Sequence, residues 1–480
     1  SVQPQAMPNA ETQCRYCDHL KDSLKELKTT KRITRSESCG AFDLMTRHFH
    51  SPTAALVWDD IENVEMKKRI DVKHFPCPRL ITDDQARALL SRVVVLKLNG
   101  GLGTSMGCTG PKSCVPVRGG DTFISLILEQ LETLNKRYGV SVPLVFMNSY
   151  NTADDTRAEV AKCNRDVEVH YFNQAAFPRL CADTMLPLKD TDADKDDPAY
   201  YYPPGHGDCL RAFKESGLAE QFHSEGREWT FISNVDNLGA TVDLPILQYL
   251  STTEYDFMPE LTPKTPLDVK GGTVVNYHGS LKLLELAQVP PEHVNEFKNI
   301  QRFDTFNTNN NYVRLSALME VDEFPFDIIV NPKTAFGKKV IQLEQAVSAA
   351  VSFFHSATLI VPRRRFVPVK TCRDLLLARS DVFVFSQGTP KLTEASVPII
   401  RLGHHYKTIS DFERRFSSGP PSMQGLVQLT VVGDVSFGSD VHVKGFVVLV
   451  ADNDHPMHIP DGMVLENKVC HATLDDLQDF

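Results

Sequence analysis

The 480-residue chain contains no apolar run near the ~20 residues that a helix needs to cross a bilayer. This absence excludes a helical membrane protein. The first ten residues lack the basic start and apolar stretch of a secretory signal, and no Ser-Lys-Leu ending closes the chain. We therefore expect a cytoplasmic protein, with an organelle of reducing lumen as the alternative.

Positive charge is scarce as well, because the formal net charge is −10. No basic stripe of the kind that neutralises DNA or RNA phosphates is present, so we expect no nucleic-acid partner. The densest basic cluster, Arg363-Arg364-Arg365, is predicted to be a solvated turn, with a phosphate or partner contact as the alternative. A few focused lysines can still bind anionic substrates inside an acidic protein.

The eleven cysteines form no disulfide framework, because their number is odd and they are scattered along a long chain. Reduced thiols are the expectation. Cys14 and Cys17 form a C-x-x-C with His19 nearby, which leaves zinc or redox chemistry as an alternative. No second pair lies at zinc-finger spacing, and the charged flanking residues favour a plain helix.

A chain of this length indicates two or three domains. Residues 1–44 form a polar start and a helical region with apolar positions at Leu20, Leu24 and Leu27. Residues 45–385 are predicted to form one large α/β domain, and residues 386–480 a separate C-terminal domain.

Within the large domain, a helix at Asp84 to Leu90 leads to the apolar run Val93 to Leu96. A glycine-rich turn and a helical pattern from Asp121 to Tyr138 follow. This order predicts a Rossmann-like, doubly wound mixed sheet. Further strand candidates are residues 143–147, 167–172, 229–233, 273–277 and 326–330. Several end in Asn, Asp or Gln, at the sheet edge where such folds bind ligands.

The last hundred residues show a different period. Leu429, Val435, Val441 and Val447 recur every six residues, with small turn residues between them. This pattern predicts a short left-handed parallel β-helix. An acyltransferase site of the hexapeptide type is disfavoured, because only about four coils fit and they offer no obvious catalytic histidine.

The sequence Asn99-Gly100-Gly101-Leu102-Gly103, continuing to Gly107 and Lys112, follows the first strand of the large domain. Glycines there let backbone N–H groups approach phosphates, and a lysine at the far end adds a cation. The spacing fits neither the dinucleotide fingerprint nor a Walker A loop, since Pro111 precedes Lys112. A plain strand–helix turn is the alternative, although it would need fewer glycines.

These residues resemble the signature of eukaryotic UTP–glucose-1-phosphate uridylyltransferases (UDP-glucose pyrophosphorylases). Asn99 and Leu102 distinguish the run from the Ala-Gly-Gly-Gln-Gly of the related N-acetylhexosamine enzymes. Other blocks resemble the family in the same order: residues 204–208, 233–239, 270–272, 306–310 and 367–371. The first fifty residues show no such block.

The resemblance implies a fold of the nucleotide-diphospho-sugar transferase type with a C-terminal β-helix. It also implies reversible UMP transfer from UTP to glucose 1-phosphate, giving UDP-glucose and pyrophosphate, by direct in-line attack. A UDP-sugar pyrophosphorylase of broader specificity and an inert regulatory subunit are the alternatives. Retention of the glycines and Lys112 argues against the inert subunit. Whether the chain is a monomer or a homo-oligomer is left open, because a β-helix end can assemble or cap.

The expected catalytic residues are Lys112, beside the glycine loop, and Lys370, which by resemblance contacts the phosphates from the opposite side. Mg²⁺ should bridge phosphate oxygens, with Asp236 as its candidate protein ligand. The candidate nucleotide-binding residues are Leu98, Asn99, Gly100, Gly101, Gly103, Lys112, Met147, Gln174, Gly205 and Asp236. The candidate sugar-binding residues are His206, Asn234, Gly272, Glu285 and Asn309.

Several of these assignments have structural alternatives. Met147 could be an ordinary core residue, and Asp236 could form an Asx turn that caps Leu238-Gly239. Residues 307–311 could be a plain turn, and His206 could simply be tolerated between two glycines. Lys264 and Lys270 are weaker candidates for attracting phosphate.

Overall fold

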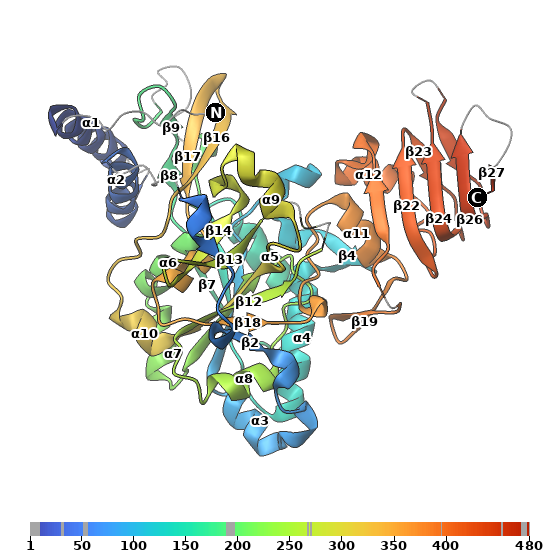
Figure 1. Cartoon of the computed structure of the whole chain (residues 1–480), viewed down its shortest axis with the longest axis horizontal. Helices are drawn as coiled ribbons and strands as arrows, with labels where there is room; N and C mark the ends of the chain where they lie inside the picture. The colour runs from blue at the N-terminus through green and yellow to red at the C-terminus, as the bar shows by residue number, and fades with distance from the viewer. Residues whose placement is uncertain are drawn as a thin grey trace.

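The computed structural model describes residues 10–29, 33–50, 56–188, 197–265, 268, 271–394, 396–452, 455–471 and 478–479. A pair of N-terminal helices, a central α/β body and a C-terminal stack of strands lie side by side (Figure 1). Among the described residues, no helix is both long enough and apolar enough to span a bilayer.

An eight-stranded sheet forms the centre of the α/β body, in the order β2-β18-β12-β15-β11-β3-β6-β7. Strand β15 is antiparallel to both of its neighbours, β11 and β12, whereas the other adjacent pairs are parallel. The mixed α/β sheet of the prediction is therefore present. Its strands are β2 (Arg69–Asp71), β3 (Val93–Leu98), β6 (Leu144–Asn148), β7 (Val169–Asn173), β11 (Trp229–Asn234), β12 (Phe257–Pro263), β15 (Thr305–Arg314) and β18 (Thr358–Ile360).

Strand β3 is buried along its whole length. Successive side chains point to opposite faces, so Val93 and Val95 join one hydrophobic core while Val94 and Leu96 join another. A continuous apolar run is typical of a strand that is covered on both faces. The same covering explains why strands β6 and β11 are apolar and buried.

Helices cover both faces of this sheet. One face packs against α3 (Asp83–Leu90), α4 (Phe123–Tyr138), α8 (Leu244–Leu250) and α11 (Cys372–Arg379). The other face packs against α6 (Cys209–Glu215), α7 (Leu218–Ser224) and α10 (Leu315–Glu320). The hydroxyl of Thr122 caps α4 at its start, and Gly139 ends it in the left-handed conformation at φ +62°. The predicted helix was therefore right apart from its first two residues, Asp121 and Thr122, which form the short strand β5 (Asp121–Thr122).

Two predicted strands lie outside the central sheet. Residues 273–277 belong to β13 (Gly272–Tyr277), which pairs with β1 (Ile61–Glu62) and β14 (Ser280–Glu285). Residues 326–330 only overlap β16 (Ile329–Ala335), which pairs with β17 (Lys338–Glu344). Each hairpin turns through two residues with positive φ, His278-Gly279 and Phe336-Gly337. Such turns join consecutive strands antiparallel, so these strands form separate small sheets.

The N-terminal helices are α1 (Ala10–Thr29) and α2 (Arg35–His50). Leu20 and Leu24 are buried as predicted, in a core shared with Leu44 and Phe177. Cys14 is exposed on α1, and Cys17 lies 3.4 Å from the Nε2 atom of His50. The described residues contain no group of three or more His, Cys, Asp or Glu side chains arranged to hold a metal.

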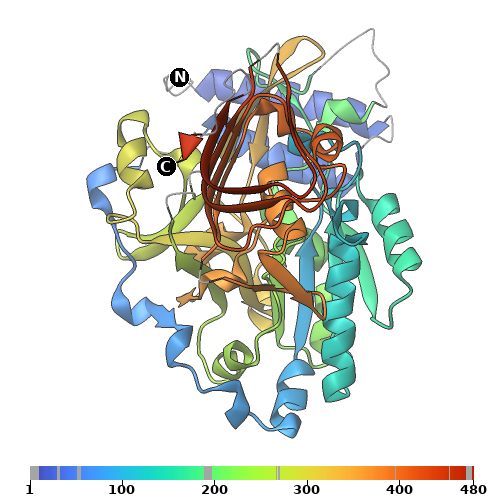
Figure 2. The ribbon, with the colours of Figure 1, turned by 90° about the vertical axis from the view of Figure 1, so that its right-hand side faces the viewer.

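The C-terminal strands stack in parallel. Strand β22 (Leu426–Val432) lies between β21 (Ile399–Leu402) and β24 (His442–Val450), and β24 continues to β26 (Val464–His471). A second face pairs β23 (Val435–Phe437) with β25 (Met457–Ile459), also in parallel. The four aliphatic residues of the six-residue period are at most 1% exposed. Figure 2 shows these coils in front of the central body, whose hydrophobic core they share.

The remaining elements are short. Helix α5 (Ala153–Cys163) connects β6 to β7, and α12 (Ile409–Arg415) lies between β21 and β22 of the C-terminal stack. The others are β4 (Pro116–Arg118), β8 (Phe177–Pro178), β9 (Leu180–Cys181), β10 (Tyr201–Tyr202), α9 (Val294–Lys298), β19 (Phe383–Ser386), β20 (Thr389–Leu392) and β27 (Gln478–Asp479).

Candidate active site

The glycine loop follows β3 at the carboxyl edge of the central sheet. Gly101 has open space where a side chain would lie, whereas a Cβ atom at Gly103 would meet the side chain of Cys108 at 2.6 Å. Gly107 has φ +71° and packs on Thr408, the residue that caps α12. The glycines therefore allow a tight fold of the loop and leave one open backbone stretch at Gly101.

Asn99 fastens this loop to the protein. Its side chain is 1% exposed and donates hydrogen bonds to the Oδ1 atom of Asn148 and the Oγ1 atom of Thr156, at 2.9 and 2.8 Å. Its backbone N–H donates to the carbonyl of Met147 at 2.8 Å, and its Oδ1 atom is buried without a partner, so this oxygen and the backbone carbonyl remain for a nucleotide. Leu98 and Met147 are buried in one hydrophobic core, so the structural alternative for Met147 matches its position.

Gln174 lies directly against Gly100. A Cβ atom added to Gly100 would come within 1.7 Å of the Nε2 atom of Gln174, so only glycine leaves room for this amide. Gln174 is 6% exposed, and its Oε1 atom is buried without a hydrogen-bond partner. A buried amide oxygen with no partner is costly unless a ligand satisfies it. This geometry fits the predicted contact with the edge of a base.

Lys112 and Asp236 meet at the carboxyl ends of β3 and β11. The Nζ atom of Lys112 lies 2.5 Å from the Oδ2 atom of Asp236, and the two side chains are only 13% and 16% exposed. Strands β3 and β11 are adjacent and parallel. After β3 the chain adds strands towards one edge of the sheet, β6 and β7, whereas after β11 it adds strands towards the other edge, β12 and β15. Such a point in an α/β sheet forms a ligand crevice.

The loop that carries Asp236 has an Asx turn, but the residue responsible is Asn237. The Oδ1 atom of Asn237 accepts from the amide of Gly239 at 3.2 Å. The Oδ1 atom of Asp236 is buried without a partner. A divalent cation fits this donor, provided that phosphates and water supply the remaining ligands, because the described residues offer no larger ligand cluster.

Lys370 follows a segment that pairs with the loop carrying Asp236. The amide of Val369 donates to the carbonyl of Asp236 at 3.0 Å, and Asn237 forms a bridge with Pro368. The side chain of Lys370 is exposed, and its charge lowers the pKa of both His206 and Glu285. Lys370 is therefore near enough to two of the five candidate sugar-binding residues, His206 and Glu285, for its charge to act on them.

His206 presents a defined tautomer to the site. Its Nδ1 atom accepts from the amide of Val347 at 3.0 Å, so the proton of the neutral ring is on Nε2. Burial, aided by Lys370, lowers its pKa to about 4. The flanking glycines fit closely against Gln345, since a Cβ atom at Gly205 would lie 2.6 Å from its carbonyl oxygen. Gly205 therefore has a packing role in addition to any ligand contact.

Glu285 ends β14 and rests on Gly272. A Cβ atom at Gly272 would lie 2.8 Å from the Oε1 atom of Glu285. Burial raises the pKa of Glu285 to about 7, although the positive charge of Lys370 opposes this rise. His206 and Glu285 are thus both buried polar groups whose pKa responds to the charge of Lys370.

Asn234 and Asn309 form a pair, because the Nδ2 atom of Asn309 donates to the Oδ1 atom of Asn234 at 2.9 Å. The alternative of a plain turn at residues 307–311 does not hold, because they lie within β15. The strand bulges there opposite β12, with Asn309 at φ +61°. Ser348 fixes the bulge by donating to the Oδ1 atom of Asn309 at 3.0 Å. A bulge can redirect a side chain at a functional site.

Sequence reasoning missed Lys97 and misjudged Arg365. Lys97 is 2% exposed, donates to the Oγ atom of Ser233 and the carbonyl of Ala240 at 2.8 Å, and burial lowers its pKa to about 7. Arg365 is no solvated turn, since it is 4% exposed and its Nη2 atom lies 2.5 Å from the Oε1 atom of Glu260. The signal in the sequence was a single lysine that continues the apolar run Val93 to Leu98 of a predicted strand.

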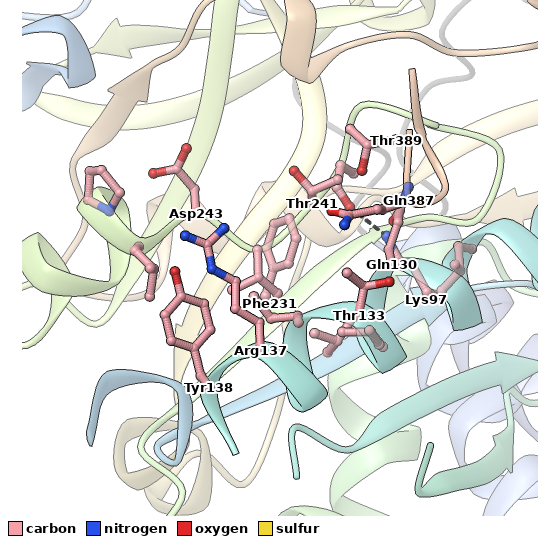
Figure 3. A pocket seen from close by; sticks show the side chains of 18 residues that line it. Lys97, Gln130, Thr133, Arg137, Tyr138, Phe231, Thr241, Asp243, Gln387 and Thr389 are labelled. Atoms are coloured by element: carbon pink, nitrogen blue, oxygen red, sulfur yellow. Dashed lines mark hydrogen bonds between the residues drawn. The ribbon is translucent and has the colours of Figure 1, made fainter. Parts of the chain in front are cut away.

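Lys97 also lines a cavity of about 300 Å³ on the α4 face of the sheet. Figure 3 shows Arg137 between Tyr138 and Asp243 at one end of this cavity and Lys97 near Gln130 at the other. The cavity contains no residue of the glycine loop. The unpartnered polar atoms of Gln174 and Asp236 lie at the glycine loop and not in this cavity.

Of the two weaker lysine candidates, the structure describes Lys264. The Nζ atom of Lys264 donates to the carbonyl of Phe297 at 2.5 Å and lies 4.6 Å from the ring of that residue. Its charge is therefore engaged within the protein. Lys270 lies outside the described residues.

A glycine loop at the sheet edge, an adjacent Lys–Asp pair and a facing polar pocket define the class of nucleotide-binding α/β transferases. A family model described as UTP--glucose-1-phosphate uridylyltransferase matches residues 40–444. Two plant UTP--glucose-1-phosphate uridylyltransferases are similar over their whole length. The barley enzyme (Hordeum vulgare) is 45% identical, with 94% of this chain and 96% of that protein covered. The potato enzyme (Solanum tuberosum) is 44% identical, with 93% and 96% covered.

Solved structures agree with the sequence comparison. A UDP-glucose pyrophosphorylase from Leishmania major, in complex with UDP-glucose, is 30% identical with a TM-score of 0.84, and the match covers 95% of this chain and 99% of that one. A Trypanosoma brucei structure described as UDP-glucose phosphorylase is 34% identical with a TM-score of 0.82, covering 94% and 99%. The chain belongs to the UTP–glucose-1-phosphate uridylyltransferase family, which confirms the resemblance seen in its motifs.

Proposed function

We propose that this chain catalyses the reversible reaction of UTP and glucose 1-phosphate to UDP-glucose and pyrophosphate at the glycine-loop site. Family membership supports the reaction. The observation that carries the location is the contact between Lys112 and Asp236, which joins the glycine loop to the neighbouring strand end. The base would lie on Gly100 and Gln174, the phosphates near Lys112, and the sugar near His206 and Glu285.

The reaction needs alignment and charge neutralisation rather than a covalent nucleophile. A phosphate oxygen of glucose 1-phosphate attacks the α-phosphorus of UTP, and the bond to the pyrophosphate group breaks in line. Lys112 on one side and Lys370 on the other would offset the negative charge that these two anions bring together. Open backbone at Gly101 would let the loop approach the nucleotide, supported by the tight folding at Gly103.

The sugar would be held by groups of fixed polarity. The Nε2–H of His206 can donate to a hydroxyl group, and Glu285 beside Gly272 can accept from one. Asn234 and Asn309 would complete the polar pocket from β11 and the bulge of β15. Paired donors and acceptors of this kind discriminate between epimers, because a misplaced hydroxyl leaves a buried group unpaired.

The metal that fits best is Mg²⁺. Its preference for phosphate oxygens and water matches a site with one unpartnered carboxylate oxygen, on Asp236. When bound, it would neutralise charge on the pyrophosphate group. The residues of the chain keep the tasks of binding and orienting the substrates.

We also propose the finer architecture that the sequence predicts. The central body would be a Rossmann-like domain of residues 45–385, preceded by helices in residues 1–44 and followed by a left-handed parallel β-helix in residues 386–480. Helix α2 continues to His50, so a boundary at residue 45 would cut this helix, and we move the first boundary to the end of the helix. The six-residue period and parallel stacking support the β-helix. A cytoplasmic location remains our proposal.

A direct assay tests the function. The protein is mixed with UTP, glucose 1-phosphate and Mg²⁺, and pyrophosphate release is measured, with a chelator and other nucleotides as controls. Formation of UDP-glucose that depends on all three components supports the proposal, and its absence contradicts it. Galactose 1-phosphate replaces glucose 1-phosphate in a parallel reaction. Comparable turnover there would favour a UDP-sugar pyrophosphorylase of broader specificity.

A further inference from the structure

Helix α2, for which the sequence indicated no function, contacts the segment that follows Gln174. Thr34 and Glu37 form a capping box at the start of this helix. The amide of Thr34 donates to the Oε2 atom of Glu37 at 2.7 Å, and the amide of Glu37 donates to the Oγ1 atom of Thr34 at 3.1 Å. The other carboxylate oxygen, Oε1, accepts from the amide of Ala176 at 3.0 Å. One side chain thus binds both its own helix and a distant loop.

A second carboxylate holds the preceding amide. Asp208 is 5% exposed, and its Oδ2 atom accepts from the amide of Ala175 at 2.7 Å. The Nε atom of Arg211 donates to the Oδ1 atom of Asp208 at 2.8 Å, and Arg211 also donates to the Oγ atom of Ser36 on α2. Consecutive amides after Gln174 are therefore fixed by carboxylates from two different helical regions.

These contacts matter because they hold Gln174 through its backbone. The amide of Gln174 donates to the carbonyl of Asn148 at 2.8 Å, and its side chain rests on Gly100. The buried Oε1 atom has no partner within the protein. A small shift of the following peptides would move this amide relative to the base. Misplacement of a recognition group by about 1 Å can cost a large factor in an enzyme reaction.

The apolar contacts of α2 do not require Glu37. Ala41, Leu44 and Met45 on α2 are buried in a core with Phe177, and Gly40 lies against the ring of that phenylalanine. These contacts dock the helix by burying apolar surface, which has no directional preference. The carboxylate adds a directional bond to Ala176, only two residues from Gln174.

We propose that α2 is part of the uracil-recognition site, with Glu37 as a positioning residue for Gln174. The inference rests on the proposed placement of the base at Gly100 and Gln174. It assigns the N-terminal helical region to substrate selection. Cytosine is the discriminating probe, because it differs from uracil at N3 and at the exocyclic group of C4, the edge that an amide contacts.

Steady-state kinetics of the full-length chain test the proposal, with UTP or CTP varied at saturating glucose 1-phosphate. We expect Glu37→Ala to raise KM for UTP about 10-fold and to reduce the preference for UTP over CTP. The kcat and the KM for glucose 1-phosphate should stay within about 2-fold, because the proposed phosphate and sugar sites are formed by other residues. Glu37→Gln, which retains one acceptor oxygen, should fall between the wild type and Glu37→Ala.

Thr34→Ala is the matched control. It removes the hydrogen bond from the amide of Glu37 to the Thr34 hydroxyl and keeps the hydrogen bond from the amide of Ala176 to the Glu37 carboxylate. It should lower the melting temperature without changing KM for UTP. Equal KM shifts in Thr34→Ala and Glu37→Ala would overturn the proposal in favour of helix docking. Unchanged UTP kinetics in Glu37→Ala would also overturn it. Gln174→Ala tests the base site separately from the role of Glu37. An unchanged preference for UTP over CTP in this variant would refute the base site itself.

Discussion

At the residue scale, Lys112 is the side chain on which the proposed chemistry depends most. Its ammonium group lies between the glycine loop and Asp236. Lys112→Ala should lower kcat/KM by at least ~100-fold, the scale expected when a preorganised charge partner is lost. Initial-rate measurements in the direction of UDP-glucose formation check this.

An exposed lysine on a nearby helix gives the control for Lys112. Lys162 on α5 has a side chain that is 78% exposed. Lys162→Ala should keep normal turnover and thermal stability. Near-normal activity of Lys112→Ala would show that the phosphates lie elsewhere.

Glu285 gives the site a dependence on pH. Its pKa of about 7 means that the carboxylate, the better acceptor for a sugar hydroxyl, forms as pH rises through neutrality. KM for glucose 1-phosphate should therefore fall between about pH 6 and 8. Glu285→Gln should lose this inflection and retain only the titration of the substrate phosphate, near pH 6. An identical pH profile in both proteins would remove Glu285 from the sugar site.

The same raised pKa has a consequence for stability. Glu285 binds its proton more tightly in the folded chain than at its ordinary pKa of 4.5. The proton on Glu285 therefore contributes fully to the free energy of unfolding below about pH 4.5, and this contribution is lost as pH rises towards 7. The Gln substitution should not show this loss.

Residue types alone pointed to the glycine loop and to Lys112 as a candidate site, because several glycines followed by a lysine after a strand have few alternative roles. The direction of each side chain could not. Asn99 looked like a ligand residue, yet it fastens the loop to α5. Lys97 and Arg365 were missed because their partners, Ser233 and Glu260, are distant in sequence.

At the scale of elements, the glycine loop depends on its contact with the C-terminal region. A Cβ atom at Gly107 would lie 2.8 Å from that of Thr408, in addition to the strain of φ +71°. Gly107→Ala should destabilise the fold by about 1–2 kcal/mol from backbone strain and by a further ~1 kcal/mol or more from overpacking. It should also raise KM for UTP, since the loop would move away from α12.

Gly119 provides a matched substitution for Gly107. It has φ +57°, and an added Cβ atom would meet nothing within 4 Å. Gly119→Ala should show the strain alone and unchanged KM for UTP. Denaturant unfolding and UTP titration of both variants compare the two effects. Equal losses would mean that the contact with Thr408 is unimportant.

The elements themselves were largely predictable, because hydrophobic periodicity identifies strands and helices locally. The strand candidates at residues 143–147, 167–172 and 229–233 entered the central sheet as β6, β7 and β11. The candidate at 273–277 lies in a separate hairpin. An apolar run predicts a strand but does not indicate which sheet the strand joins. Pairing over long sequence distances depends on tertiary packing, which no local pattern contains.

At the scale of the whole molecule, the C-terminal coils and the central body share one hydrophobic core. We therefore expect a single cooperative unfolding transition. Leu429 in β22 is fully buried, whereas both tryptophans, Trp58 and Trp229, lie in the central body. Leu429→Ala should lower the midpoint of thermal unfolding, followed by tryptophan fluorescence, by about 2–5 °C. The cavity left by the smaller side chain would weaken the core that both regions share.

Val427, which lies in the same strand and is 48% exposed, is the control. Val427→Ala should leave the midpoint within about 1 °C, since surface substitutions seldom change stability much. A two-step transition, or a fluorescence midpoint unaffected by Leu429→Ala, would show that the coils unfold independently.

The pairing of β2 with β18 also affects how the chain is made. Thr358, in β18, donates a hydrogen bond to the carbonyl of Lys68, which is 290 residues earlier. At translation rates of 5–20 residues per second, the ribosome needs about 15–60 s to synthesise that interval. Strand β2 must wait unpaired throughout, so the timing of translation, rather than chain collapse, sets when this edge of the sheet can close.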